Sequence, residues 1–253
     1  MKACDKELIF NLLKNASAHF NGYTKDVYKS EHKFIDDEEN QSVSQNEGLE
    51  QNQIKTPEAE SFAHTSKTTL EEIASKIARC TRCTLARTRN NVVPGMGVEN
   101  PEVLVIGEGP GYDEDKQGLP FVGKAGILLD KMLAAIGLDR KTNCYIANIV
   151  KCRPPQNRDP YPQEQDACFS FLEAQINILK PKIILCMGKI SSNKMLNQNV
   201  PIGTLRGQLF EYNGIPLMVT YHPSALLRNE ELKRPAWDDL KKFKAKLDEI
   251  NQK

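Results

Sequence analysis

The sequence predicts an α/β protein, a three-layer sandwich in which helices cover both faces of a four-stranded, mainly parallel sheet. Two observations predict this fold. Four short apolar runs have the length and composition of buried strands, and helix-like stretches lie between them. Strands that alternate with helices along a chain are typical of a parallel sheet covered on both faces.

The expected strands are residues 103–107, 144–150, 183–187 and 217–221. The expected helices are residues 70–77, 124–136, 162–179, 189–196 and 235–250. Pro162 and Pro235 suit the first turn of a helix, where a missing N–H costs no hydrogen bond. Because ligands of such sheets bind beyond the carboxyl ends of the strands, we expect the chemistry directly after these runs.

The first 66 residues differ in composition from the rest. Residues 35–66 are rich in acidic and amide side chains and hold few large apolar ones, so they cannot bury enough surface to offset the entropy of ordering. Residues 5–20 have the pattern of one amphipathic helix. We therefore expect an N-terminal extension, 1–66, made of a short helix and an acidic flexible linker, and one folded domain, 67–253. The extension is either a solvated tail or a helix that docks on an unknown partner.

The distribution of charge and the number of cysteines indicate which class of partner and which cell compartment the protein suits. The first 66 residues carry a net charge of −5 and the rest +6, within a total of +1. A basic body suits a polyanionic partner without proving one. We find no signal peptide or membrane span in the sequence, and seven cysteines then favour a reducing compartment, the cytoplasm.

Four cysteines have the pattern of a metal site. Cys80 and Cys83 form a C-x-x-C pair, and Cys152 and Cys168 follow far downstream. Four thiolates hold either zinc or an iron–sulfur cluster, and the spacing alone does not choose between them. Cys144 and Cys186 lie in strand patterns and are expected to be buried apolar residues. Basic residues flank the four positions and are expected to offer positive charge to phosphates: Arg79, Arg82, Arg87, Arg89, Lys151 and Arg153.

Three motifs follow expected strands. A glycine-rich loop, 107–126, begins GEGPGYDED and ends GLPFVGKAG, a pattern that holds a phosphate or a flat ring against backbone amides. It lacks the spacing of ordinary nucleotide-binding loops. The second motif is NIVKCRPPQNR at 148–158, and the third is HPSALLR at 222–228.

Together these segments resemble the family 4 uracil-DNA glycosylases, the iron–sulfur branch of their superfamily, from about Thr68 to the C-terminus. The resemblance implies an enzyme that flips uracil out of DNA, hydrolyses its N-glycosidic bond to deoxyribose and leaves an abasic site. It implies a 4Fe-4S cluster on Cys80, Cys83, Cys152 and Cys168. We also expect a monomer that needs no membrane.

The resemblance also implies roles for single residues. Uracil presents an acceptor at O4 and a donor at N3, and cytosine the reverse, so the Asn148 amide could select uracil. Phe121 would stack on the base, and His222 would donate to uracil O2 as negative charge develops there. Gly109 stands where better-known relatives carry a catalytic Asp.

No strong base replaces that Asp, so Glu108, Glu114 and Asn157 are expected to shape the pocket and position water. Ser224 and Arg228 would contact phosphates, and Leu226 would wedge into the space the base leaves. Two other functions stay open: a non-catalytic, cluster-bearing DNA-binding module, and a small-molecule enzyme that uses the glycine loop for phosphate.

Overall fold

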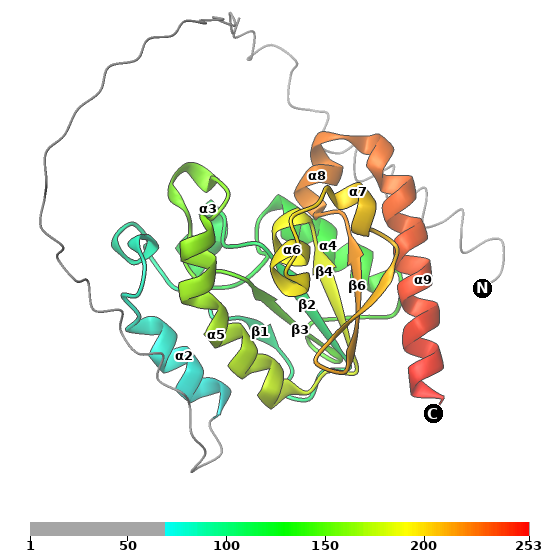
Figure 1. Cartoon of the computed structure of the whole chain (residues 1–253), viewed down its shortest axis with the longest axis horizontal. Helices are drawn as coiled ribbons and strands as arrows, with labels where there is room; N and C mark the ends of the chain where they lie inside the picture. Colours follow the sequence, from blue (N-terminus) through cyan, green and yellow to red (C-terminus); the bar gives the residue numbers. More distant parts are fainter. Residues whose placement is uncertain (1–68, 253) are drawn as a thin grey trace, which may run out of the picture. The chain divides into compact units, whose positions relative to one another are not determined.

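The computed structural model describes residues 69–252 and is organised around one six-stranded sheet (Figure 1). The strands are β1 (Met96–Gly97), β2 (Val103–Gly107), β3 (Cys144–Asn148), β4 (Ile183–Met187), β5 (Leu209–Tyr212) and β6 (Ile215–Thr220). Their order across the sheet is β1-β3-β2-β4-β6-β5. The four inner strands are parallel, whereas β1 and β5 pair antiparallel at the two edges.

The helices connect and cover these strands. They are α2 (Leu70–Ala78), α3 (Tyr112–Gln117), α4 (Lys124–Ala134), α5 (Pro162–Leu179), α6 (Lys189–Leu196), α7 (Ile202–Leu205), α8 (Pro223–Arg228) and α9 (Lys233–Asn251), with 3-10 turns η1 (Thr84–Arg87), η2 (Pro155–Asn157) and η3 (Glu230–Leu232). The predicted fold class is confirmed, and the four expected strands are the inner, parallel ones. The expected number of four strands is wrong, because the two edge strands, β1 and β5, were not predicted from the sequence.

The core has two halves, one on each face of the sheet. Alternate residues of each inner strand point to opposite faces, as Leu104 and Val105 of β2 do. On one face the strands pack against α2 and α5, and on the other against α4, α8 and α9 (Figure 1). Cys144 and Cys186 are fully buried in strands, which confirms their predicted role as apolar core residues.

Local sequence explains where the main helices begin. Thr69 caps α2 through a reciprocal pair of bonds with Glu72. Pro162 is the first residue of α5, as predicted. Helix α9 starts at Lys233, two residues before the predicted start, so Pro235 still lies in its first turn.

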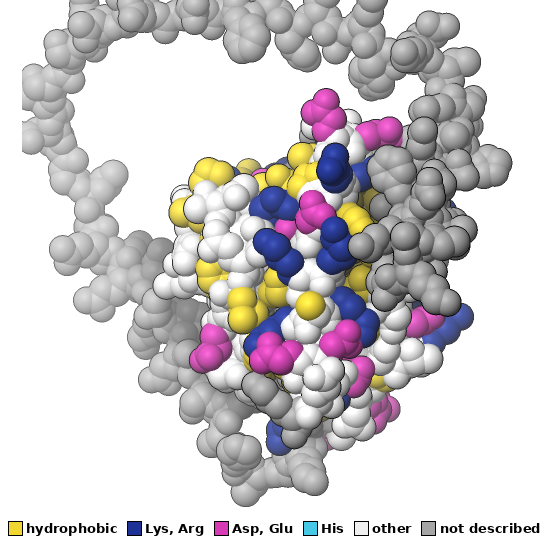
Figure 2. All heavy atoms as spheres, turned by 90° about the vertical axis from the view of Figure 1, so that its right-hand side faces the viewer, with side chains coloured by type: hydrophobic (Ala, Val, Ile, Leu, Met, Phe, Trp, Pro, Cys, Tyr) yellow, Lys and Arg dark blue, Asp and Glu magenta, His cyan; other side chains and the backbone are white. Residues whose placement is uncertain are grey.

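The surface over α9 carries charges of both signs, as Figure 2 shows for the side that lies on the right in Figure 1. Several are paired along the helix, such as Lys241 with Asp238 and Lys246 with Glu249. Within residues 69–252, no helix is both long enough and apolar enough to cross a membrane. The predicted N-terminal extension, 1–66, lies outside the described residues.

Candidate active site

A pocket opens at the carboxyl ends of the four parallel strands. Its walls come from the loops after β2, β3, β4 and β6, together with the starts of α3, α4 and α8. Nine residues predicted from the motifs line it: Glu108, Gly109, Glu114, Phe121, Asn148, Asn157, His222, Ser224 and Arg228. Because parallel strands end at one edge, segments more than 100 residues apart in the chain meet there.

Asn148 is the last residue of β3 and is buried, with 2% of its surface exposed. Within the described part of the chain, its Oδ1 is the one buried side-chain oxygen or nitrogen without a hydrogen-bond partner. Gly107 makes room for it, because a Cβ there would lie 2.4 Å from Oδ1. An unpaired buried acceptor costs about 1–3 kcal/mol, so this atom is suited to a ligand N–H.

Phe121 lies against the same glycine. A Cβ on Gly107 would lie 2.6 Å from the Phe121 ring. The ring centroid is 5.5 Å from that of His222, at an interplanar angle of 32°. Phe121 has a φ of 52°, a left-handed conformation that costs a bulky residue about 1–3 kcal/mol. The surrounding contacts must therefore stabilise this conformation.

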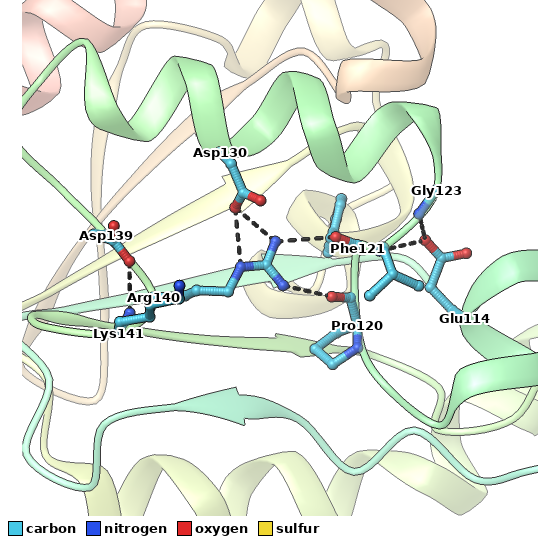
Figure 3. Close-up of polar contacts among 9 residues, drawn as sticks. Glu114, Pro120, Phe121, Gly123, Asp130, Asp139, Arg140 and Lys141 are labelled. Carbon is cyan, nitrogen blue, oxygen red and sulfur yellow. Dashed lines mark hydrogen bonds and ion pairs between the residues drawn. The ribbon is translucent and has the colours of Figure 1, made fainter.

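Glu114 supplies some of those contacts. Its Oε1 accepts from the backbone N–H groups of Val122, at 2.9 Å, and Gly123, at 3.0 Å (Figure 3). Its Oε2 accepts from the backbone N–H of Gly111. Both carboxylate oxygens are thus occupied by backbone amides. Glu114 therefore joins the start of α3 to the start of α4 at the wall of the pocket, and its roles in shaping the pocket and positioning water stay predictions.

His222 also lines the pocket and caps α8. The Ser224 backbone N–H donates to His222 Nδ1 at 3.2 Å, and the Ser224 hydroxyl oxygen lies 2.8 Å from the same nitrogen. Burial, and next the charge of Arg228, lower the His222 pKa to about 4. The imidazole is therefore neutral at physiological pH. Since Nδ1 accepts, its proton sits on Nε2, which makes Nε2 a hydrogen-bond donor.

Glu108 is the carboxylate best suited to proton transfer. Burial, and next the negative charge of Asp159, raise its pKa to about 7, while Arg228 lowers it. Asp159 and Arg228 also line the pocket. A carboxyl group that titrates near neutral pH in a pocket is typical of general acid–base sites.

Two further predicted pocket residues shape its wall. Asn157 has a φ of 56°, and its Oδ1 accepts from Arg153 Nε at 2.7 Å. A Cβ on Gly109 would lie 2.6 Å from Val150 Cγ2. A carboxylate could not stand at position 109 without displacing Val150, which agrees with the missing Asp.

The three residues predicted to contact DNA differ in their exposure. Ser224 and Arg228 line the pocket mouth, and Arg228 is exposed. The wedge prediction for Leu226 is wrong for this conformation, because Leu226 is 1% exposed and packs in the core beside α4 and α9. Its neighbour Leu227 is 42% exposed. Helix α8 turns Leu226 toward the core and Leu227 toward solvent.

The four predicted ligand cysteines are neighbours in the structure. Cys80 and Cys83 pack against the core cluster that contains Cys152 and Cys168. The four thiols also act on one another electrostatically. Burial is the main cause that raises the pKa of Cys83, Cys152 and Cys168. Neighbouring thiols add smaller increases: Cys80 to the pKa of Cys83, Cys83 and Cys80 to that of Cys152, and Cys152 and Cys83 to that of Cys168. Such mutual repulsion between thiolates is relieved when a cation binds among them.

Four neighbouring thiols are a donor set that both zinc and iron–sulfur clusters use. Among residues 69–252, no three His, Cys, Asp or Glu side chains stand close enough to hold one metal ion. Arg89 Nη1 donates to Cys152 Sγ at 3.2 Å and the Lys151 N–H to Cys168 Sγ at 3.3 Å, bonds that stabilise cluster sulfurs.

The predicted basic rim around the cysteines is only partly present. Arg79, Arg82 and Arg87 are exposed. Lys151 is 1% exposed, and its Nζ donates to the Asn148 carbonyl oxygen and to Gln175 Oε1. Lys151 therefore stabilises the end of β3 and cannot offer charge to DNA.

Sequence reasoning missed several residues that build the site. Asp159 acts on Glu108 from a neighbouring loop, and Asp113 lines the pocket beside Gly123. Asp115, fully buried, accepts from the backbone N–H groups of Asn90 and Asn91, which ties α3 to the segment after η1. Only the position of Asp113 and Asp115 inside the glycine-rich motif could have indicated a role.

Comparisons with known proteins agree with this geometry. A family model described as "Uracil DNA glycosylase superfamily" matches residues 94–241. The type-4 uracil-DNA glycosylase of Thermotoga maritima is 41% identical over 186 residues, 72% of this chain and 96% of the relative. Its counterpart in Archaeoglobus fulgidus is 39% identical over 182 residues, 69% of this chain and 91% of the relative. The type-4 uracil-DNA glycosylase of Sulfurisphaera tokodaii is 42% identical over 184 residues, which is 69% of this chain and 83% of the relative.

Proposed function

Because this chain belongs to the uracil-DNA glycosylase superfamily, and within it to the type-4 branch, we propose that it removes uracil from DNA as a monofunctional glycosylase. The observation that carries the proposal is the unpaired, buried Oδ1 of Asn148. Oδ1 of Asn148 accepts a hydrogen bond from uracil N3–H, and the side-chain amide N–H of Asn148 donates one to uracil O4. Cytosine presents the opposite pair of groups and would leave Asn148 unsatisfied.

The base must leave the helix to reach Asn148. In the pocket it stacks on Phe121, a contact worth about 1–3 kcal/mol. Extrusion is easiest where pairing is weakest, so single-stranded and mispaired uracil should react fastest.

Bond cleavage places negative charge on the base. When the bond from C1′ to N1 breaks, its electron pair stays with uracil and is shared between N1 and O2. His222 is neutral and donates from Nε2, so it stabilises this anion without transferring a proton. A donor that bonds more strongly to the developing anion than to the neutral base lowers the barrier.

Water completes the reaction at the sugar. Its oxygen adds to C1′ of the oxocarbenium-like sugar, and its proton passes to the Glu108 carboxylate and then to solvent, while the uracil anion takes a proton from solvent. Glu108 suits this step because its pKa is about 7 and both oxygens of Glu114 are already occupied. Asn157 and Glu114 shape the space in which the water stands.

We further propose that Cys80, Cys83, Cys152 and Cys168 hold a 4Fe-4S cluster. When bound, it supplies a rigid cross-link between the segment after α2, the loop after β3 and α5. Arg89 and the Lys151 amide orient two of the sulfurs. Among the DNA contacts, Ser224 and Arg228 bind phosphates, and Leu227, the exposed leucine of α8, replaces Leu226 as the wedge.

The arrangement of the chain follows from the same proposal. Residues 67–253 form the catalytic domain, and residues 1–66 are an extension that base excision does not need. The pocket as described needs no second copy, which favours a monomer. A DNA substrate and reduced thiols favour the cytoplasm.

The test uses purified protein and oligonucleotides, single- and double-stranded, with one uracil. Alkali then cleaves the strand at any abasic site. Cleavage at uracil and none at cytosine or thymine in the same position is expected, with a loss of about a hundred- to thousandfold for His222→Ala. Protein that carries its iron and binds the DNA without cleaving it would instead be the non-catalytic module.

A further inference from the structure

The segment that carries Phe121 is held from two sides by charged side chains (Figure 3). On one side, Glu114 accepts from the amides of Val122 and Gly123. On the other, Arg140 Nη1 donates to the Pro120 carbonyl oxygen at 2.8 Å, and Nη2 donates to that of Phe121 at 3.0 Å. The three successive peptide groups around Phe121 therefore each have their direction fixed.

Arg140 is itself fixed in place. It is 8% exposed and reaches the segment from the loop after α4, nineteen residues along the chain from Phe121. Asp130 Oδ1 accepts from its Nε at 2.9 Å and from its Nη2 at 2.7 Å (Figure 3). All three guanidinium nitrogens are thus engaged. A planar fork of this kind cannot be reproduced by the single nitrogen of a lysine.

The backbone around Phe121 has a conformation that requires stabilising contacts. Phe121 is left-handed, a conformation that persists in a bulky residue only where the surroundings determine it. Its carbonyl group also approaches α4 closely, because a Cβ on Gly126 would lie 1.9 Å from the Phe121 oxygen. In this conformation the carbonyl faces Arg140, while the ring stands beside Gly107 and His222 in the pocket.

We propose that Arg140, oriented by Asp130, is a positioning residue that holds the Phe121 ring ready for the flipped base. This inference rests on the proposed excision of uracil. Arg140 does not line the pocket and acts only through the backbone of 120 and 121. When the Phe121 ring is already in place, binding of the base does not have to order it. The loss of Arg140 should therefore slow excision without changing the groups that act at C1′.

The first test compares Arg140→Lys with Lys141→Met in excision from single-stranded uracil DNA. Arg140→Lys keeps the charge and loses the fork, and we expect kcat/KM to fall about 10- to 100-fold. Lys141→Met removes one charge from the neighbouring exposed position and should leave kcat/KM unchanged. In a Phe121→Ala background, Arg140→Lys should cost less than about twofold, because the ring that it positions is gone. An equal loss in both backgrounds would overturn the proposal.

A second readout does not depend on activity. Hydrogen exchange should show faster exchange at Val122 and Gly123 in Arg140→Lys, while the amides of α5 exchange as in the wild type. Unchanged protection together with wild-type activity would overturn the proposal. If Arg140→Lys does not fold, Asp130→Asn replaces it, since the Asp130 side chain is 53% exposed and its loss frees the guanidinium without emptying a buried site. If the wild-type protein releases no uracil, the proposed function is wrong. Hydrogen exchange at Val122 and Gly123 then still shows whether Arg140 holds the backbone around Phe121.

Discussion

The backbone N–H of Ser224 points at Nδ1 of His222, 3.2 Å away, and so fixes which nitrogen of the imidazole carries the proton. Burial keeps the ring neutral down to a pKa of about 4. His222 therefore does not titrate between pH 5 and 9, and any change of activity in that range must come from another group. Glu108 in the pocket has a pKa of about 7 and therefore titrates in that range.

We predict that kcat rises about tenfold between pH 6 and 8, with an inflection near pH 7. The Glu108 carboxyl is protonated below its pKa of about 7 and ionised above it, and only the carboxylate accepts a proton from water. A pH–rate profile under single-turnover conditions measures this. In Glu108→Gln the rate should be lower and flat with pH. Asp159→Asn should move the inflection to lower pH, because Asp159 raises the Glu108 pKa; a shift to higher pH would contradict the assignment.

Asn148→Leu should separate stability from activity. Leucine has the same branching at Cγ and removes a buried oxygen that has no partner, so thermal unfolding should occur at the same or a higher temperature than in the wild type. Excision of uracil should fall by at least about a hundredfold. Differential scanning calorimetry and the oligonucleotide assay measure the two effects. Wild-type excision by the leucine variant would remove Asn148 from the recognition step.

The two leucines of α8 should behave in opposite ways. Leu226→Ala opens a cavity in the core and should lower the free energy of unfolding by about 2–5 kcal/mol. Leu227→Ala should change it by less than about 0.5 kcal/mol and should slow excision from paired uracil more than from single strands. Denaturant melts and parallel assays on both substrates distinguish them. An equal effect of Leu227→Ala on both substrates would argue against a wedge.

Iron content should divide the cysteines into two groups. Substitution of Cys80, Cys83, Cys152 or Cys168 by serine should lower the bound iron from four atoms per chain, the number in a 4Fe-4S cluster, and remove the visible absorbance of the protein. Cys144→Ala and Cys186→Ala are matched controls, since both thiols are buried in strands and should leave the iron in place. Zinc in place of iron in protein purified without oxygen would contradict the cluster.

The sequence predicted the inner sheet well because buried parallel strands are continuous apolar runs, which leave a strong local pattern. The edge strands leave a weaker one. β1 has two residues, and β5 alternates exposed and half-buried residues. One signal for β5 was present and overlooked: Asn213-Gly214 joins β5 to β6, and this dipeptide is typical of a tight hairpin turn.

The pocket residues were predictable where they lie in motifs, and the residues that support them were not. Arg140 stands in an unremarkable loop, and only the fold brings it to Phe121. Lys151 was misread because lysine next to a basic loop is usually solvated, whereas here Gln175 and the Asn148 carbonyl satisfy it inside the protein. Contacts between distant segments depend on the packing of the whole domain, which no local pattern contains.

The four parallel strands that end at the pocket also make it inseparable from the rest of the domain. Each wall continues into β2, β3, β4 or β6, and these strands share one hydrogen-bonded ladder with both halves of the core beneath them. The strand ends that carry such a site move only together with the sheet. On heating, the pocket should therefore keep its shape until the sheet melts, so that inactivation and unfolding occur as a single event.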